Sequence, residues 1–173
     1  NDQGNVGDEY PIFPKAEIIK RYKHNPIITV DDLPCRSNSV FNSGCIKVDD
    51  QYVMMLRIED VYGSQHFRMA YSKDGMNFDI SKTPVNIPVS ENEQYYELLC
   101  YDPRITPLMG EYYVCYAAHG TKGVRVSIMK TKDFENFERV CYASQPDNRN
   151  GVLFPEKIDG RFILLNRPTV AYG

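Results

Sequence analysis

Short apolar stretches alternate with turn-forming residues along most of the chain. The stretches richest in Val, Ile, Tyr and Phe are predicted strands at 45–48, 52–58, 112–118, 124–129 and 162–165. Asp-Asp, Asp-Gly, Met-Gly and Lys-Gly pairs, which favour tight turns, interrupt them. No segment keeps a helical period of 3.6 residues over three turns. The pattern therefore predicts an all-β protein with short loops.

An internal repeat refines this prediction. Residues 72–78 (SKDGMNF) and 131–137 (TKDFENF) match, 59 positions apart. A second element, in which a two-residue turn joins two strands, recurs at 45–57, 104–117 and 154–167. Repeats of about 40–60 residues that form small antiparallel meanders are typical of a β-propeller. Propellers usually close with about 4–8 blades, so we expect these roughly three units to be part of a longer ring.

Aligning the three copies brings polar residues to equivalent positions. The copies align on an aromatic residue of the second strand, which is Tyr52, Tyr112 or Phe162. Eleven and ten positions earlier stand Phe41/Asn42, Tyr101/Asp102 and Gly151/Val152. Five positions after the aromatic residue stand Arg57, Ala117 and Arg167. Because the first strand of each blade lines the axis, Asn42, Asp102, Arg57 and Arg167 are expected to converge at one mouth of the channel.

Arg57 ends an apolar strand, where a charge is costly unless it is paired. Glu59 and Asp60 follow it closely and are the predicted partners. A purely structural ion pair is therefore one hypothesis for Arg57.

Composition and charge narrow the class of protein. The chain has 173 residues, of which 42% are hydrophobic and 25% charged, as in a globular domain. Its net charge of −3 argues against a nucleic-acid partner. No apolar run approaches the ~18 residues of a membrane span. The five cysteines form no C-x-x-C pair, so free thiols are expected rather than a zinc site.

Residues 1–24 differ from the rest, because they are first polar and then basic. We predict an N-terminal extension over 1–24 and an incomplete propeller domain over 25–173. The chain begins with Asn1 and shows no leader sequence, so its compartment stays open.

Several segments resemble glycoside hydrolase family 130, the mannoside phosphorylases. They are 37–44 (SNSVFNSG), 56–60 (LRIED), 71–78 (YSKDGMNF), 101–106 (YDPRIT), 131–137 (TKDFENF), 148–162 (NRNGVLFPEKIDGRF) and 166–168 (NRP). The resemblance extends from about residue 25 to the end. It implies a five-bladed β-propeller, of which this chain covers about the first half, acting on β-mannosides in the cytoplasm or periplasm of a bacterium.

The resemblance also implies the site residues. The catalytic acid of the family is the Asp of the D-P-R motif, here Asp102. The phosphate-binding positions fall on Arg149, Asn150 and Arg167. The substrate-binding positions fall on Asn42, Ser43, Arg57, Asp60 and Tyr101. Arg104 is a further candidate, for which a structural and a substrate-binding role are both open. Inorganic phosphate is the implied co-substrate, without another cofactor or a metal, and a homo-oligomer remains open.

The chemistry favours phosphorolysis over hydrolysis. An inverting hydrolase needs two carboxylates about 6.5–9.5 Å apart, one of which activates water. A phosphorylase needs a single acid and a cationic cradle for phosphate, and the arginine fork matches phosphate oxygens. One clear acid with two arginines therefore fits phosphorolysis better than hydrolysis. Together with the resemblance, this predicts inverting phosphorolysis of a β-mannoside, of the manno-oligosaccharide or mannosyl-glucose type, to α-mannose 1-phosphate. In the family, the proton is thought to pass through a sugar hydroxyl.

Two other functions remain as alternatives. One is a β-mannosidase of the same family, and the other is a non-catalytic carbohydrate-binding propeller. The individual residues also have plain structural interpretations. Asp102 precedes Pro103, and its structural alternative is a carboxylate that caps a turn. Arg149 lies in a polar loop, where an arginine is ordinarily solvated.

Overall fold

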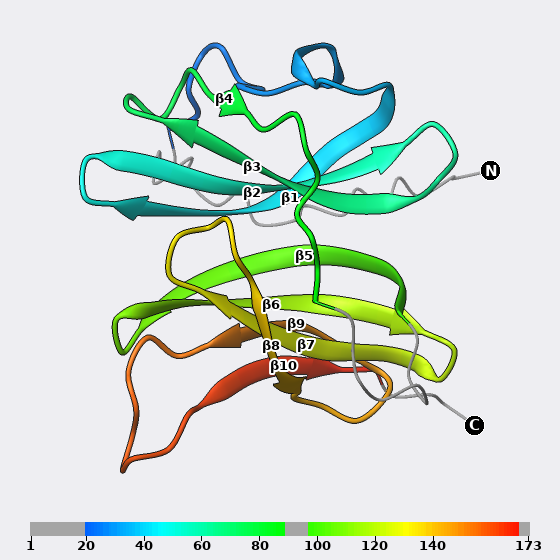
Figure 1. Cartoon of the computed structure of the whole chain (residues 1–173), viewed down its shortest axis with the longest axis vertical. Coiled ribbons are helices and arrows are strands. Elements are labelled where there is room, and N and C mark those ends of the chain that lie inside the picture. Colours follow the sequence, from blue (N-terminus) through cyan, green and yellow to red (C-terminus); the bar gives the residue numbers. More distant parts are fainter. Residues whose placement is uncertain (1–19, 89–96, 170–173) are drawn as a thin grey trace, which may run out of the picture.

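The chain forms stacked antiparallel sheets. The computed structural model describes residues 20–88 and 97–169. Within these ranges, the regular secondary structure consists of β-strands and one 3₁₀ turn, η1 (Val30–Asp32). The strands form two four-stranded sheets and a two-stranded sheet (Figure 1). The all-β prediction is confirmed, whereas the expectations for residues 1–19 lie outside the described residues.

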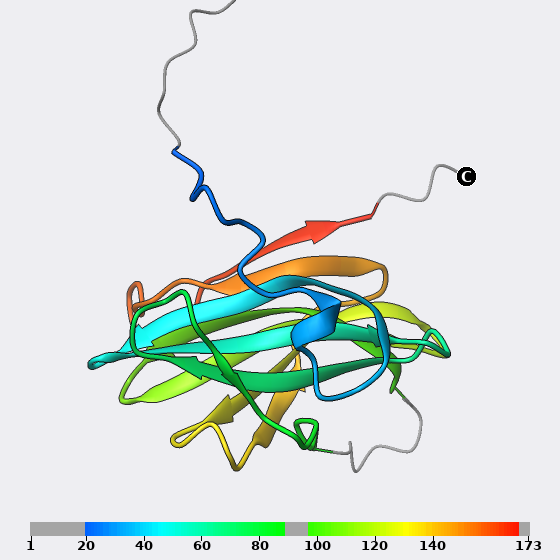
Figure 2. The ribbon, with the colours of Figure 1, turned by 90° about the horizontal axis from the view of Figure 1, so that it is seen from above.

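Each sheet follows the chain in order, as a propeller blade does. The first contains β1 (Ser37–Val48), β2 (Gln51–Asp60), β3 (Gln65–Ser72) and β4 (Asp79–Ile80). The second contains β5 (Glu97–Leu108), β6 (Glu111–Gly120), β7 (Gly123–Thr131) and β8 (Glu138–Tyr142). The third contains β9 (Asn148–Leu153) and β10 (Leu164–Pro168). β1 and β9 lie along one side of the stack and β8 along the other (Figure 2).

A bulge interrupts the first strand of each blade at the equivalent position. The residues at the bulges, Asn42, Asp102 and Asn150, have positive φ angles of 47°, 55° and 58°. Asn and Asp tolerate this left-handed conformation better than other non-glycine residues. A bulge bends its strand and turns a side chain away from the regular ladder. The three repeats thus present three polar side chains in the same way.

The sequence alignment of the third copy, which puts Gly151 and Val152 at this position, is wrong. The residues that pair beside the bulge are 16 positions apart in the first two copies. They are 18 positions apart in the third, where Arg149 pairs with Arg167. The connection between β9 and β10 is therefore two residues longer. Counting back ten positions from Phe162 therefore stops two residues short of the bulge, which falls on Asn150.

The main hydrophobic core fills the space between the first two sheets. Its buried side chains are Val53, Met55, Phe67, Met69, Cys100, Val114, Tyr116, Ala118, Met129 and Phe134. The rings of Phe67 and Tyr116 meet edge to face, with centroids 5.7 Å apart. Burying one large apolar side chain contributes about 1.5–3 kcal/mol, so this interface fixes the two blades face to face. A second cluster joins the second sheet to β9 and contains Cys115, Val126, Ile128 and Leu153.

The repeated heptapeptides form the same turn twice. Asp74 accepts hydrogen bonds at Oδ1 from the backbone N–H groups of residues 76 and 77. Asp133 does the same with residues 135 and 136. Hydrogen bonds from Asn77 and Asn136, respectively, are the largest cause of a lowered pKa at the two carboxyl groups. The conserved spacing of this repeat therefore reflects turn geometry.

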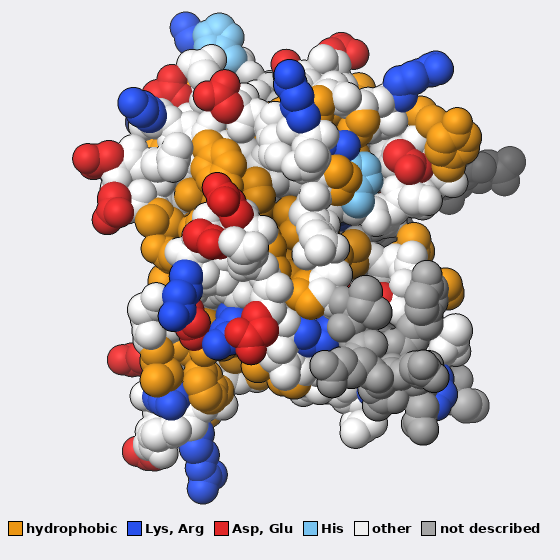
Figure 3. All heavy atoms as spheres, viewed as in Figure 1, with side chains coloured by type: hydrophobic (Ala, Val, Ile, Leu, Met, Phe, Trp, Pro, Cys, Tyr) orange, Lys and Arg blue, Asp and Glu red, His pale blue; other side chains and the backbone are white. Residues whose placement is uncertain are grey.

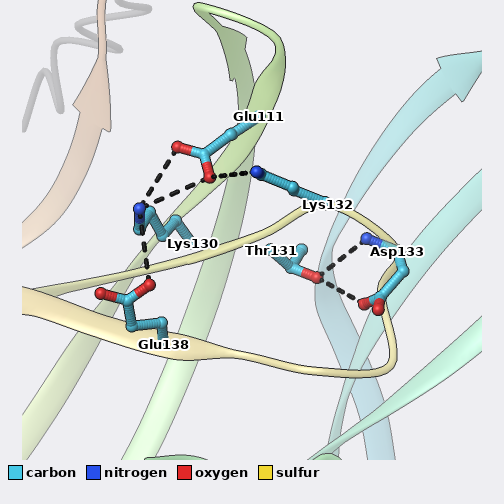
Figure 4. A network of polar contacts seen from close by, with 6 residues as sticks. All are labelled: Glu111, Lys130, Thr131, Lys132, Asp133 and Glu138. Atoms are coloured by element: carbon cyan, nitrogen blue, oxygen red, sulfur yellow. Dashed lines mark hydrogen bonds and ion pairs between the residues drawn. The ribbon is translucent and has the colours of Figure 1, made fainter.

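Beside the second of these turns lies a surface network of charged residues (Figure 4). The ammonium group of Lys130 lies 3.3 Å from Glu111 and 3.4 Å from Glu138. The hydrogen bond to Glu111 raises the pKa of Lys130. Acidic and basic side chains are interspersed over the face of the molecule shown in Figure 3. Exposed ion pairs contribute little to stability, so we assign this network no part in the site. None of the helical structure described is long and apolar enough to cross a membrane.

Candidate active site

The bulges of β1 and β5 bring Asn42 and Asp102 together. Asn42 Nδ2 donates a hydrogen bond of 3.0 Å to Asp102 Oδ1. Arg57 Nη1 donates a second one, of 2.5 Å, to the same oxygen. The side chain of Asp102 is only 14% exposed. The predicted convergence of these three residues is therefore observed, and their contacts tie the first blade to the second.

The partner predicted for Arg57 is wrong. Arg57 pairs with Asp102, 45 positions away, and not with Glu59 or Asp60. Asp60 is the last residue of β2, and its Oδ1 accepts hydrogen bonds from the backbone N–H groups of residues 62 and 64 in the following turn. A partner in another blade leaves no local signal in the sequence, because the two residues meet only after the sheets stack.

The guanidinium group of Arg57 is enclosed on several sides. Its centre lies 4.1 Å from the ring centroid of Phe41 and 4.8 Å from that of Tyr101. Its Nε donates a hydrogen bond of 2.9 Å to Gln65 Oε1. The side chain is 11% exposed, which strengthens its electrostatic contacts relative to those on the surface. Sequence reasoning assigned no role to Phe41 or Gln65.

Two further predicted residues lie at or beside the bulges of β1 and β5. Ser43 follows Asn42 within the same bulge of β1. Arg104 Nη1 donates a hydrogen bond of 3.4 Å to the backbone carbonyl of Asp102. Among the described residues, Arg104 thus hydrogen-bonds to a backbone oxygen and not to the carboxylate that a structural ion pair would need.

The remaining predicted residues meet in the third blade. Arg149 of β9 and Arg167 of β10 are direct cross-strand partners. Like charges in this arrangement repel one another. The structure pairs neither arginine with a carboxylate of the described residues. Arg149 Nε and Asn150 Oδ1 are buried and have no hydrogen-bond partner within residues 20–88 and 97–169. Buried polar atoms are normally satisfied, so this pair of arginines has the features of an anion site.

The first strands of the three blades are connected in series. The Asn42–Asp102 hydrogen bond links β1 to β5. Thr106 Oγ1 of β5 donates a hydrogen bond of 3.1 Å to the carbonyl of Leu153 in β9. The carboxylate of Asp102 on β5 and Arg149 on β9 therefore lie on neighbouring first strands, and Arg167 lies on β10, the strand paired with β9.

Cys100 lies on β5, two residues before Asp102. Burial raises the pKa of its thiol to about 12, so the thiol is neutral at physiological pH. Its Sγ lies 3.8 Å from the backbone carbonyl of Gln65, to which it donates a weak hydrogen bond. A thiolate nucleophile at this position is therefore excluded, and Cys100 instead helps to hold β3 against β5.

The stacked antiparallel sheets, with a polar cluster on their first strands, have the arrangement of β-propeller blades. The family model described as β-1,4-mannooligosaccharide phosphorylase, glycoside hydrolase family 130, matches residues 10–172. The chain belongs to this family.

Individual relatives agree with this assignment. The chain is 34% identical to a β-1,4-mannooligosaccharide phosphorylase of Ruminococcus albus over 88% of its own length and 47% of that protein. It is 30% identical to a 1,2-β-oligomannan phosphorylase of Thermoanaerobacter sp. over 86% of its own length and 53% of that protein. The chain thus spans about half the length of these curated relatives.

A solved structure supports the fold. The β-1,2-mannobiose phosphorylase from Listeria innocua, in complex with β-1,2-mannobiose, superposes with a TM-score of 0.75 at 23% identity. The match covers 88% of this chain and 59% of that one. The propeller prediction is confirmed.

Proposed function

We propose that the protein catalyses inverting phosphorolysis of a β-mannoside and releases α-mannose 1-phosphate. The observation that carries the proposal is the division of charge between the blades. One oriented carboxylate lies at the contact of the first two blades, and two paired arginines lie on the third. Phosphorolysis needs one acid and a cradle for a phosphate dianion, which matches this division. The curated relatives are named as mannoside phosphorylases.

In this proposal Asp102 is the general acid. Both of its donors reach Oδ1, so Oδ2 is the oxygen suited to carry the proton. A phosphate oxygen attacks the anomeric carbon from the side opposite the departing oxygen, and the glycosidic C–O bond breaks with inversion. The proton of Asp102 passes to the departing oxygen, through a sugar hydroxyl as the family implies. The step therefore needs phosphate as the nucleophile and one acid, and it needs no activated water.

The other residues bind the two substrates. Arg149, Asn150 and Arg167 hold phosphate: the unpaired Arg149 Nε is a free donor, and the two guanidinium groups supply the positive charge. Sugar contacts are assigned to Asn42, Ser43, Arg57, Asp60, Tyr101 and Arg104. The ring of Tyr101 offers an aromatic face at the site, and aromatic rings pack well on the apolar faces of sugars.

The test is an assay of the full-length protein with β-1,4- or β-1,2-mannobiose, with and without inorganic phosphate. We expect ³¹P NMR to detect α-mannose 1-phosphate only when phosphate is present. Asp102→Asn should lose about 10²–10⁴-fold in kcat, because Asn accepts the same hydrogen bonds but delivers no proton. Release of mannose at an equal rate without phosphate would instead establish the hydrolase.

A second variant tests the phosphate cradle. Arg149→Ala should raise the KM for phosphate more than the KM for the mannoside, since this arginine is assigned to the nucleophile alone. The matched control is Arg161→Ala, an exposed arginine in the connection between β9 and β10, which should change neither constant. An equal rise of both constants in Arg149→Ala would contradict the assignment.

A further inference from the structure

Gln65 contacts Arg57, the arginine that pairs with the proposed acid Asp102. It is the first residue of β3 and pairs with Glu59 of β2. Its side-chain Oε1 accepts a hydrogen bond of 2.9 Å from Arg57 Nε. Its backbone carbonyl lies 3.8 Å from Cys100 Sγ on β5. Gln65 is therefore fixed at both its main chain and its side chain.

The contact with Gln65 completes the enclosure of Arg57. Phe41 and Tyr101 lie within 4.8 Å of the guanidinium centre, so the rings restrain its position. The rings leave rotation of the guanidinium within its own plane less restrained. The hydrogen bond to Nε supplies that restraint, because a planar fork with one end fixed directs its other nitrogens.

The direction of Arg57 in turn determines which oxygen of Asp102 is occupied. Arg57 Nη1 and Asn42 Nδ2 both donate to Oδ1. A rotated guanidinium would reach between the two carboxylate oxygens and compete for Oδ2. General acid catalysis requires the proton to stand on the oxygen that faces the substrate.

We propose that Gln65 is a positioning residue for phosphorolysis, acting through Arg57 to keep Asp102 Oδ1 occupied and Oδ2 available for the proton. This inference rests on the proposed function of Asp102. Gln65 itself touches neither substrate in this scheme. Its removal should therefore lower kcat more than it raises the KM for the mannoside.

Two substitutions separate positioning from simple packing. Gln65→Leu keeps much of the side-chain volume but removes the acceptor of Arg57 Nε. We expect kcat to fall about tenfold or more, since small displacements at a reacting centre are costly. Gln65→Glu keeps an acceptor oxygen at the same reach and should restore kcat to within a few-fold of the wild type. Gln51→Leu, at the exposed first residue of β2, is the matched control and should change nothing.

A second readout does not depend on turnover. Exchange of the Arg57 Nε proton with water, followed by ¹H–¹⁵N NMR, should accelerate about tenfold in Gln65→Leu and stay slow in Gln65→Glu and Gln51→Leu. Should Gln65→Leu fold poorly, Gln65→Asn, which is one methylene shorter, breaks the same contact with polarity retained. It should give the same two losses.

The outcomes are distinct. Loss of kcat with faster exchange, both rescued in Gln65→Glu, supports the positioning role. Unchanged kcat with faster exchange overturns it, as does lost kcat with unchanged exchange. If the wild type shows no phosphorolysis, the proposed function fails. Slow, unchanged exchange in Gln65→Leu would then still refute the contact between Gln65 and Arg57.

Discussion

The contact between Gly44 and Pro103 predicts a sharp effect of one methyl group on the proposed acid. Gly44 is buried in β1, directly after the bulge, and faces the backbone of β5. A Cβ atom added at Gly44 would lie 2.6 Å from the carbonyl oxygen of Pro103. Such atoms do not approach within about 3.0 Å, so Gly44→Ala must move the backbone beside Asp102 by at least about 0.4 Å.

The size of the effect follows from this displacement. A misplacement of about 1 Å can cost about 10²-fold in rate, so a shift of roughly half that size should lower kcat about tenfold. Overpacking of this kind costs about 1–3 kcal/mol of the free energy of unfolding. The assay is phosphorolysis at saturating substrates, together with urea unfolding of the same preparation.

Gly110→Ala is the matched control for this substitution. Gly110 lies in the turn between β5 and β6 with φ of 78°, and no heavy atom lies within 4 Å of an added Cβ. The substitution strains the backbone at a cost of about 1 kcal/mol without a clash. We expect normal kcat in the folded fraction. A Gly44→Ala enzyme with kcat within twofold of the wild type would refute the idea that this close contact sets the position of Asp102.

Two further predictions concern titratable groups. The lowered pKa of Asp133 means that its carboxylate stabilises the fold at neutral pH. This contribution should be lost as the pH falls below about 4. The melting temperature of Asp133→Asn should therefore fall less on acidification than that of the wild type. Burial raises the thiol pKa of Cys100 and Cys115 to about 12, so mass spectrometry after alkylation at pH 8 should find label on the exposed Cys45 and Cys141 and not on the buried pair.

Local pattern was sufficient to predict the strands of the first two blades, whereas the strand predicted at 162–165 overlaps β10 only at Leu164 and Leu165. The apolar run at 52–58 falls within β2, and that at 124–129 within β7. Met-Gly and Lys-Gly pairs mark turns that are present at Gly110 and Gly123, both with positive φ. These features depend on neighbours in the sequence, which is why the strands and turns could be predicted.

Contacts between blades could not be predicted in the same way. The ion pair between Arg57 and Asp102 joins residues of two sheets, and Glu59 was expected because it is near in sequence. Gln65 carried no signal at all, since its importance comes from the register of β3 against β2 and from the stacking of β5. The position of the third bulge was predicted wrongly because the alignment counted back from the aromatic residue of the second strand. Such a count does not detect that the connection in the third copy is longer.

Repetition of the backbone explains how one small motif serves two different tasks. The position paired with the bulge strand holds Arg57 in the first blade and Arg167 in the third, in strands of the same kind. Arg57 faces the carboxylate of the neighbouring bulge, so its charge orients the proposed acid. Arg167 instead pairs across the strands with Arg149, which stands where the first blade has Phe41, and the two cations together leave positive charge to attract an anion. Because the fold fixes the position, the side chains that contact each arginine decide whether it serves proton transfer or phosphate binding in the proposed reaction.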